Sequence, residues 1–326
     1  MKIAVIGTGS MGKMHVRVLQ NIPDVRDICI ADIDKEALNQ TVRQFGIHKA
    51  YSNCSELLEK EKPDGVIVAT EPENHKKPAI EAMGQGIAVL VEKPIASTLE
   101  DAKEMIEKSK EAGVIFTVGH TERFNPVISK IKELIDSKAL SNLYLVNTHR
   151  IGPFPKRFLG KEDGVLIDLA VHDFDIIHYL CGKIERMDSQ IINGRGQEIY
   201  VRTLMDVEHN IKASCEFSWV SPRKVRTIEI YSGSGMILGD HIKKEALFYT
   251  NSDYKSELDN SILQNGLINY GKVVECVIQK QEPLLLELVN FVGAIKGQNH
   301  VFVKPLEAAL ALENALHLKE RILKQD

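Results

Sequence analysis

The first third of this chain alternates short, almost continuously apolar runs with segments of helical pattern. The apolar runs are KIAVIG (2–7), DICIAD (27–32), GVIVAT (65–70), IAVLVE (87–92) and IFTVGH (115–120). Such runs are typical of strands that are buried on both faces of a sheet. The helical patterns lie near residues 11–21, 35–45, 74–84 and 98–111, with Thr98 placed to cap the last one. This regular succession predicts an α/β fold with a doubly wound parallel sheet.

The pattern changes after residue 120. Runs with period-two alternation, such as IKASCEFSWV and TIEIYSGS, predict a mostly antiparallel sheet with one face covered by helices. We expect a strand at 143–151, and helices around 126–137, around 165–180 and twice in the C-terminal tail. Because 326 residues are many for one hydrophobic core, we predict two domains. They are an α/β domain with the parallel sheet at residues 1–120 and an α+β domain at residues 121–326.

The composition excludes several classes of protein. The net charge of −4 gives no general attraction to nucleic acid or to an anionic membrane, and the basic cluster RKVR (223–226) is typical of a solvated strand face. No apolar run reaches the roughly 18–20 residues that a membrane span needs. The five cysteines are scattered and form no CxxC pair, which argues against a disulfide framework or a zinc site. We therefore expect a cytoplasmic protein with reduced thiols.

The sequence GTGSMG (7–12) places Gly7, Gly9 and Gly12 between the first expected strand and the first expected helix. In this context the glycines permit a tight turn, close approach of a pyrophosphate, and close packing of helix on strand. The phosphates would lie at the helix N-terminus, where Ser10 and Met11 stand and where free N–H groups favour negative charge. The alternative is a tight turn between strand and helix that binds nothing.

Asp32 ends the second expected strand, twenty residues after the glycine segment. Its carboxylate can accept hydrogen bonds from both hydroxyls of a ribose and would repel a 2′-phosphate. We therefore expect NAD rather than NADP as the cofactor.

The segment ATEPENHKKPA (69–79) follows the third apolar run. Ligands of open α/β sheets lie outside the carboxyl ends of the strands. Thr70, Pro72, Asn74 and His75 are therefore expected to line the nicotinamide half of the cofactor. Alternatively, Asn74 caps a helix and His75 is exposed.

The stretch VLVEKPIAS (89–97) places Glu92 and Lys93 where the fourth strand leaves the core, directly before a proline. We assign both residues to the cofactor site and expect Lys93 over the crevice in which the nicotinamide lies. A solvated strand end is the alternative.

Asp168 and His172 in GVLIDLAVHDFDII (164–177) are four residues apart and share one face of an expected helix, which Asp175 continues. A carboxylate beside an imidazole fixes its tautomer and stabilises the imidazolium form, as a general base requires. An ordinary surface contact is the alternative. A metal site at these side chains lacks a convincing further ligand, so we expect none.

Together these motifs resemble the glucose–fructose oxidoreductase / inositol dehydrogenase family, also called Gfo/Idh/MocA, over essentially the whole chain. The resemblance rests on GTGSMG, ATEPENH, EKPIA, GHTERFNP (119–126) and DLAVHDFD (168–175), in that order. It implies an N-terminal Rossmann domain and a C-terminal α/β domain with a large open sheet that builds homodimers or homotetramers. It also implies NAD(P)-dependent oxidation or reduction of a secondary hydroxyl on a sugar, an inositol or a related polyol.

The resemblance assigns catalysis to Lys93 and to the pair Asp168 and His172. It implies that His120, Arg123 and Asn125 border the substrate and the nicotinamide. Two departures leave the substrate open: of the family's frequent glycine cluster only Gly164 is present, and Ala170 stands at a place that is often glycine.

Within the family, GHTERFNP, HRIGPFP (149–155) and VLIDLAVHDFDI look most like the UDP-N-acetylglucosamine 3-dehydrogenase branch. Arg150, Lys156 and Arg157 would then meet a diphosphate, since guanidinium groups suit phosphate oxygens, or would form a solvated basic loop. The expected reaction is oxidation of the 3-hydroxyl of UDP-N-acetylglucosamine. The alternatives are a dehydrogenase of free inositol or a simple sugar, a dehydrogenase of a UDP-sugar uronate, and a non-enzymatic NAD(H) redox sensor.

An alcohol that loses a hydride must also lose a proton, which the protein has to accept. Histidine, with an ordinary pKa of about 6.5, accepts a proton near neutrality more readily than lysine at about 10.4. We expect His172, oriented by Asp168, to be the base and Lys93 to bind the same oxygen. The reverse assignment stays open.

Overall fold

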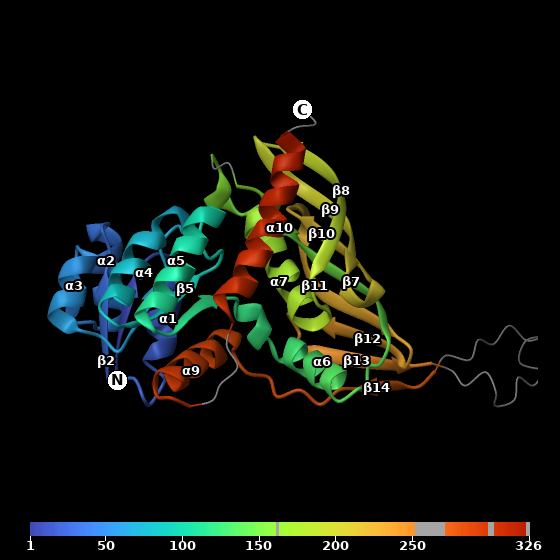
Figure 1. Ribbon diagram of the computed structural model, residues 1–326, viewed down its shortest axis with the longest axis horizontal. Coiled ribbons are helices and arrows are strands. Elements are labelled where there is room, and N and C mark those ends of the chain that lie inside the picture. Colours follow the sequence, from blue (N-terminus) through green and yellow to red (C-terminus); the bar gives the residue numbers. More distant parts are fainter. Residues whose placement is uncertain (161–162, 252–270, 299–302, 324–326) are drawn as a thin grey trace, which may run out of the picture. The chain divides into compact units, whose positions relative to one another are not determined.

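The computed structural model describes residues 1–160, 163–251, 271–298 and 303–323 (Figure 1). The chain divides into two compact units. Unit 1 combines Met1–Phe124 with Gln281–Asn314, and unit 2 combines Asn125–Lys280 with Ala315–Asp326. This division differs from the expected one, which placed the whole chain after residue 120 in the second domain.

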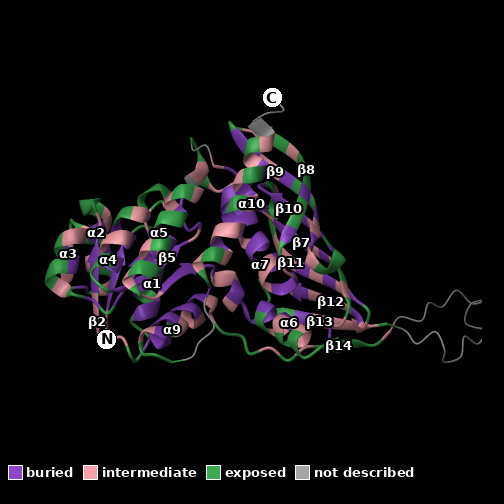
Figure 2. Ribbon diagram, in the orientation of Figure 1, coloured by how far each residue is buried: buried purple, intermediate pink, exposed green. Residues whose placement is uncertain are grey.

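Unit 1 contains a six-stranded parallel sheet with the order β3–β2–β1–β4–β5–β6, which confirms the predicted doubly wound sheet. The central strands are buried along almost their whole length, as their apolar runs require (Figure 2). All five predicted strands are present: β1 (Lys2–Ile6), β2 (Asp27–Ala31), β4 (Gly65–Val68), β5 (Ala88–Glu92) and β6 (Phe116–Gly119).

The predicted helices of unit 1 are also present. They are α1 (Ser10–Leu19), α2 (Lys35–Phe45), α4 (Lys76–Gly84) and α5 (Leu99–Ala112). The Thr98 cap is confirmed, because the Asp101 N–H donates to Thr98 Oγ1 at 3.1 Å. Strand β3 (Lys49–Tyr51) and helix α3 (Cys54–Glu61) were missed. A three-residue edge strand is too short to show a periodic pattern.

Helix α9 (Pro283–Ile295) explains why a late segment belongs to unit 1. Its apolar side chains Leu284, Leu288, Phe291 and Val292 share one buried cluster with residues of α1 and of the parallel sheet. Gly65 at the start of β4 makes room for it, since a Cβ there would lie 2.6 Å from Cδ1 of Ile295. The helix was predicted, but the core against which it packs depends on contacts far apart in sequence.

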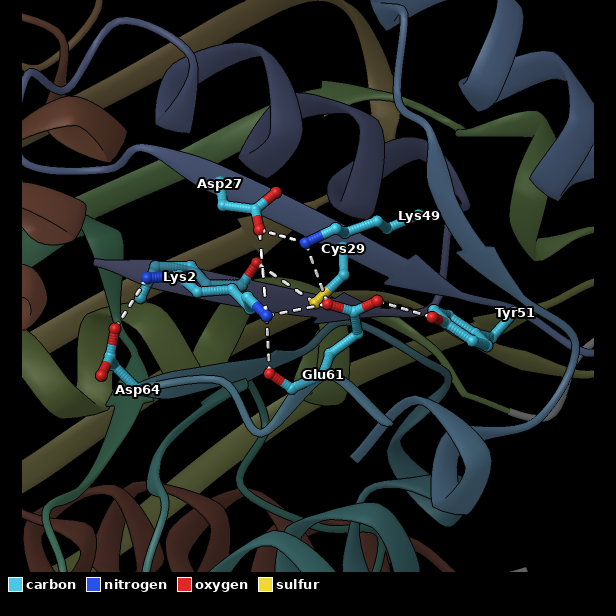
Figure 3. A network of polar contacts seen from close by, with 8 residues as sticks. Lys2, Asp27, Cys29, Lys49, Tyr51, Glu61 and Asp64 are labelled. Carbon is cyan, nitrogen blue, oxygen red and sulfur yellow. Dashed lines mark hydrogen bonds and ion pairs between the residues drawn. The ribbon is translucent and has the colours of Figure 1, made fainter. Parts of the chain in front are cut away.

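Lys2, Asp27 and Lys49 stand at the amino ends of β1, β2 and β3 and belong to a polar network that the Tyr51 hydroxyl, from the other end of β3, also joins (Figure 3). Glu61 at the end of α3 accepts hydrogen bonds from Lys2 Nζ at 2.8 Å and from the Tyr51 hydroxyl at 2.6 Å. Lys49 Nζ lies 3.1 Å from Glu61 and also pairs with Asp27. Each lysine of this network therefore faces two carboxylates. We call Lys2, Asp27, Lys49, Tyr51 and Glu61 the amino-end network.

Unit 2 contains an eight-stranded sheet with the order β14–β13–β12–β11–β7–β10–β9–β8, in which only the pair β7–β10 is parallel among the described strands. This confirms the predicted, mostly antiparallel sheet. The strands are β7 (Leu143–Pro153), β8 (Ile184–Gly194), β9 (Gln197–Val207), β10 (Ile211–Ser218), β11 (Val220–Ser232), β12 (Gly235–Asp240), β13 (Glu245–Thr250) and β14 (Val273–Glu275).

Helices α6 (Pro126–Asp136) and α7 (Val171–Cys181) pack against one face of this sheet, where Phe174 meets Phe217 edge to face. Helix α10 (Pro305–Leu323) ends the described chain. Within the described ranges, no helix combines the length and the apolar character needed to cross a bilayer.

Candidate active site

The glycine segment forms the turn between β1 and α1. Gly7 has a φ of +91°, and a Cβ there would lie 2.6 Å from the Ala69 carbonyl oxygen; a Cβ on Gly12 would lie 1.9 Å from that of Gly7. Both positions therefore require glycine. Gly9 differs, because a Cβ there meets no atom within 4 Å. Gly9 precedes α1 without a side-chain cap, so the helix N-terminus with Ser10 and Met11 offers its N–H groups to an anion.

Asp32 lies against this turn. Its Oδ2 accepts hydrogen bonds from the backbone N–H of Thr8 at 2.5 Å and from the Thr8 hydroxyl at 2.9 Å, while Oδ1 accepts from the Asp34 N–H at 2.9 Å. The open space at Gly9, the helix N-terminus and a carboxylate beside the turn fit a dinucleotide.

The loop after β4 holds Thr70 and the 3₁₀ turn Pro72–Asn74, with Asn74 exposed. His75 is fully buried, so the alternative of an exposed His75 is wrong. Its Nε2 lies 3.1 Å from the Thr70 carbonyl oxygen and its Nδ1 lies 3.3 Å from that of Ile95. Burial lowers the pKa of His75, so the neutral ring donates only one of these bonds at pH 7. His75 thereby connects the loop after β4 to the segment after Lys93.

Lys93 directly follows β5 and is half-buried, whereas the Glu92 side chain points inward and is only 6% exposed. The Glu92 carboxylate contacts His15 of α1, with 2.6 Å between His15 Nε2 and Glu92 Oε1. Its other oxygen accepts the backbone N–H of Lys93 at 3.2 Å. The structure thus places Glu92 beneath the Lys93 turn, in contact with the helix that begins at the glycine segment.

Sequence analysis missed two residues in this region, His15 and Glu287. His15 is fully buried, and Glu287 of α9 is 3% exposed. Glu287 Oε2 accepts a hydrogen bond from the Thr121 hydroxyl at 3.1 Å. A signal for Glu287 was available, because a lone acid in the run PLLLELVNF falls on the same helical face as the buried Leu284 and Phe291.

Three expected substrate contacts lie near the end of β6 or at the start of unit 2. His120 is 1% exposed. The buried Arg123 pairs with Glu307 of α10, with 2.5 Å between Nη1 and Oε2. The Asn125 side chain caps α6 through the Val127 N–H at 3.1 Å and donates to the His241 carbonyl oxygen at 3.3 Å. Arg123 and Asn125 thus have contacts within the protein that stabilise the fold, in addition to the substrate role expected for them.

Asp168 and His172 lie at the junction of two kinds of helix. The expected helix at 165–180 is a π-helical turn over Leu166–Ala170, and becomes α-helical only at Val171. Asp168 is 8% exposed and His172 is half-buried. A π turn widens the repeat beyond the α-helical spacing, so the simple face relation expected for an α-helix does not describe this pair. Such turns occur frequently at functional sites.

Gly164 precedes this turn and has a packing reason to be glycine, since a Cβ there would lie 2.3 Å from the Glu198 carbonyl oxygen. Among the residues that the structure describes, no three His, Cys, Asp or Glu side chains are grouped to hold a metal ion.

Arg150 is buried and forms two hydrogen bonds with Asp173 of α7, at 2.8 Å from Nε and 3.0 Å from Nη2. Its planar group is therefore engaged by a carboxylate. Lys156, in the 3₁₀ turn Lys156–Phe158, is exposed.

Lys93 belongs to unit 1, and the pair Asp168 and His172 belongs to unit 2. The structure brings the glycine segment, Asp32, the loop after β4 and Lys93 together around the carboxyl ends of the parallel strands. The meeting of Lys93 with His172 at one substrate is a proposal, taken up below.

Comparison with known proteins adds independent findings. The model of the oxidoreductase family with an NAD-binding Rossmann fold, GFO_IDH_MocA, matches residues 1–120, and that of the GFO/IDH/MocA C-terminal domain matches residues 128–238. The chain is 34% identical to the scyllo-inositol 2-dehydrogenase (NAD(+)) of Bacillus subtilis (strain 168), over 96% of this chain and 91% of that protein. It is 26% identical to the myo-inositol 2-dehydrogenase of Thermotoga maritima, over 96% and 93%.

Among solved structures, UDP-N-acetylglucosamine 3-dehydrogenase GnnA from Acidithiobacillus ferrooxidans superposes with a TM-score of 0.83 and 21% identity, over 97% of this chain and 96% of that chain. This likeness shows a shared fold.

Proposed function

Because this chain belongs to the GFO/IDH/MocA oxidoreductase family, we propose that it is an NAD-dependent dehydrogenase that oxidises a secondary hydroxyl of a cyclic polyol such as inositol. Family membership makes the chain an oxidoreductase with an NAD-binding Rossmann fold, and sets aside the non-enzymatic redox sensor. The observation that carries the choice of polyol is the 34% identity with an inositol dehydrogenase over nearly the whole chain.

The choice of NAD over NADP rests on Asp32. Its carboxylate is held beside the glycine segment by Thr8 and by the Asp34 N–H. A negative charge fixed there accepts hydrogen bonds from ribose hydroxyls and repels a 2′-phosphate.

From the sequence we expected a sugar nucleotide as the substrate, with Arg150 binding its diphosphate. The Arg150 guanidinium already forms a buried ion pair with Asp173. If it bound a phosphate instead, the buried Asp173 carboxylate would lose its partner. This supports a substrate without a diphosphate. UDP-N-acetylglucosamine stays the second candidate, because Lys156 in the turn after β7 is exposed and the fold is shared with GnnA.

For the mechanism, we propose that Lys93 and His172 meet at one alcohol oxygen. NAD, held by the glycine segment and Asp32, would supply the hydride acceptor for the carbon that bears this oxygen. His172, oriented by Asp168, accepts the hydroxyl proton. Lys93 donates a hydrogen bond to the same oxygen and favours the developing alkoxide. In the reverse assignment, Lys93 accepts the proton and His172 orients the substrate.

In unit 2, one face of the sheet is covered by helices while exposed apolar side chains such as Leu204 and Ile192 lie on the other. We extend the proposal to a homodimer or homotetramer formed through this sheet, and to a cytoplasmic location.

The first experiment mixes the protein with NAD or NADP and a panel of alcohols, and follows the absorbance of reduced nicotinamide. The panel holds scyllo-inositol, myo-inositol, glucose, UDP-N-acetylglucosamine and its uronate. We expect the fastest turnover with an inositol and NAD. Faster turnover of UDP-N-acetylglucosamine than of both inositols would overturn the proposed substrate.

The same assay tests the catalytic residues. Lys93→Ala and His172→Ala should each lower kcat by about 10²–10⁴-fold while NAD still binds. Lys77→Ala, at an exposed lysine of α4, is the matched control and should turn over normally. Near-normal turnover by either site variant would remove that residue from the mechanism.

A further inference from the structure

Unit 1 contains a buried acid cluster that no step of the proposed reaction uses. It consists of Glu92, His15 and Glu287, whose exposed fractions are 6%, 0% and 3%. Two carboxyl groups with one imidazole in a dry interior are costly, because charges leave water without full compensation. A cluster of this kind beside a candidate cofactor site calls for a physical reason.

Glu92 is the charged member of the cluster. Burial alone would raise the pKa of Glu92, but the hydrogen bond from His15 and the positive charges of His15 and Lys93 outweigh burial and lower it. The contact of 2.6 Å between His15 and Glu92 joins α1 to the end of β5. Helix α1 begins at the glycine segment, so one buried contact links that segment to the Lys93 turn.

Glu287 is the neutral member. Burial raises the pKa of Glu287 well above its ordinary value, and the nearby charge of Glu92 raises it further, against a hydrogen bond from Thr121. Two adjacent carboxyls in a dry site cannot both ionise cheaply, so the proton stays on Glu287. The negative charge of the cluster is therefore carried by Glu92 alone.

The local backbone is shaped around the Glu92 carboxylate. A Cβ on Gly119 of β6 would lie 3.3 Å from both Cδ and Oε2 of Glu92, so glycine leaves room for the acid on the neighbouring strand. The same Oε2 accepts the Lys93 N–H at 3.2 Å. The carboxylate is thereby held at a fixed place beside the lysine backbone.

We propose that Glu92, held by His15, is a positioning residue that fixes the Lys93 turn and keeps a negative charge beside the lysine amine. This inference rests on the proposed function, in which Lys93 binds the substrate oxygen in its charged form. The titratable groups that face Glu92 are His15 from α1, Lys93 from its own turn, His75 from the loop after β4, and Glu287 from α9.

The test measures the lysine amine directly, without relying on turnover. The full-length protein is labelled with acetic anhydride over a range of pH, and labelling of Lys93 is quantified by mass spectrometry, with exposed Lys77 as the internal reference. In Glu92→Gln, which keeps the side-chain shape and removes the charge, the midpoint for Lys93 should move downward by roughly one pH unit. Glu36→Gln is the matched control, because it removes an exposed carboxylate on α2 and should leave the midpoint in place.

His15→Phe provides a second route if Glu92→Gln does not fold. Without its imidazole partner the Glu92 carboxylate is no longer held beside the Lys93 turn, so the Lys93 midpoint should fall in the same direction. An unmoved midpoint in the folded Glu92→Gln and His15→Phe variants, or an equal shift in Glu36→Gln, would overturn the inference.

The kinetic counterpart separates positioning from binding. Glu92→Gln should lower kcat by about 10-fold and move the Lys93-dependent limb of the pH profile downward, while its Kd for NADH changes by less than about 3-fold. The two proposals also fail separately. Normal turnover by Lys93→Ala refutes the proposed mechanism without altering the labelling result, whereas an inactive Lys93→Ala with an unmoved Glu92→Gln midpoint refutes this inference alone.

Discussion

The two ends of the parallel sheet in unit 1 treat acidic side chains in opposite ways. At the amino end, Glu61 meets Lys2, Lys49 and Tyr51 in the amino-end network of Figure 3. At the carboxyl end, Glu92 has a single imidazole partner in His15, and the neighbouring Glu287 is kept neutral. The same fold thus compensates its charges fully at one end and sparingly at the other.

The pKa values record this difference. Hydrogen bonds from Lys2 and Tyr51 outweigh burial and lower the pKa of Glu61 to about 2, whereas burial raises that of Glu287. A saturated network stabilises the fold, while under-compensated buried acids reduce stability and are kept where chemistry needs them. We conclude that the amino end serves stability, and that the carboxyl end holds the candidate site.

The largest expected effect comes from the glycine segment at the carboxyl end. Gly12→Val should lower the free energy of unfolding by about 3–5 kcal/mol, because its side chain collides with the Gly7 backbone. Urea unfolding measures this. Gly9→Ala is the matched variant: its methyl group enters open space, so stability should change by less than about 0.5 kcal/mol while the Kd for NAD rises about 10-fold. Unchanged NAD binding in Gly9→Ala would remove this turn from the cofactor site.

The next effect is a contrast between Glu61 and Glu287 in how each makes the free energy of unfolding depend on pH. The folded pKa of Glu61, about 2, lies below the unfolded value of about 4.3, so its stabilisation is complete above pH 4.3 and is lost as pH falls toward 2. Glu61→Gln should lower stability by about 1–3 kcal/mol at neutral pH and flatten this acid limb, with kcat unchanged. Glu287 has the opposite sign: its folded pKa is raised, so stability is lost as pH rises above about 4.3.

Denaturant unfolding of both Gln variants across pH checks this contrast. Glu287→Gln should weaken the fall in stability on the alkaline side and leave the acid limb in place. Parallel pH dependences in the two variants would show that the two ends do not differ as described.

The smallest expected effect is that of Tyr51→Phe in the amino-end network. It removes one hydrogen bond to Glu61, of 2.6 Å, and should lower the free energy of unfolding only slightly, without altering turnover. The Glu61 carboxylate raises the pKa of Tyr51 to about 12, chiefly through this hydrogen bond. Ultraviolet titration of the tyrosines should therefore lose a component that ionises near pH 12 in the variant, and a titration with that component intact would contradict the contact.

Local patterns predicted most of the architecture. Continuous apolar runs identified five of the six parallel strands, and Thr98 was correctly predicted as a helix cap. Both predictions succeeded because burial on both faces and helix capping depend on residues that are close together in the sequence. The sequence did not predict the short elements β3 and α3 or the π turn at Leu166–Ala170, because segments of three to eight residues show too little periodicity.

For the candidate site, the residues alone identified the glycine turn, its acid Asp32 and the lysine at the end of β5, because each follows a strand that periodicity reveals. The burial of His75, the Arg150–Asp173 pair and the cluster of His15, Glu92 and Glu287 emerged only from the folded chain. The Arg150–Asp173 pair joins residues 23 positions apart, and the His15–Glu92 contact joins residues 77 positions apart. The protonation of such buried groups depends on how much water the packing excludes. Short-range order is set by adjacent side chains, whereas the charge of a buried group is set by everything that surrounds it.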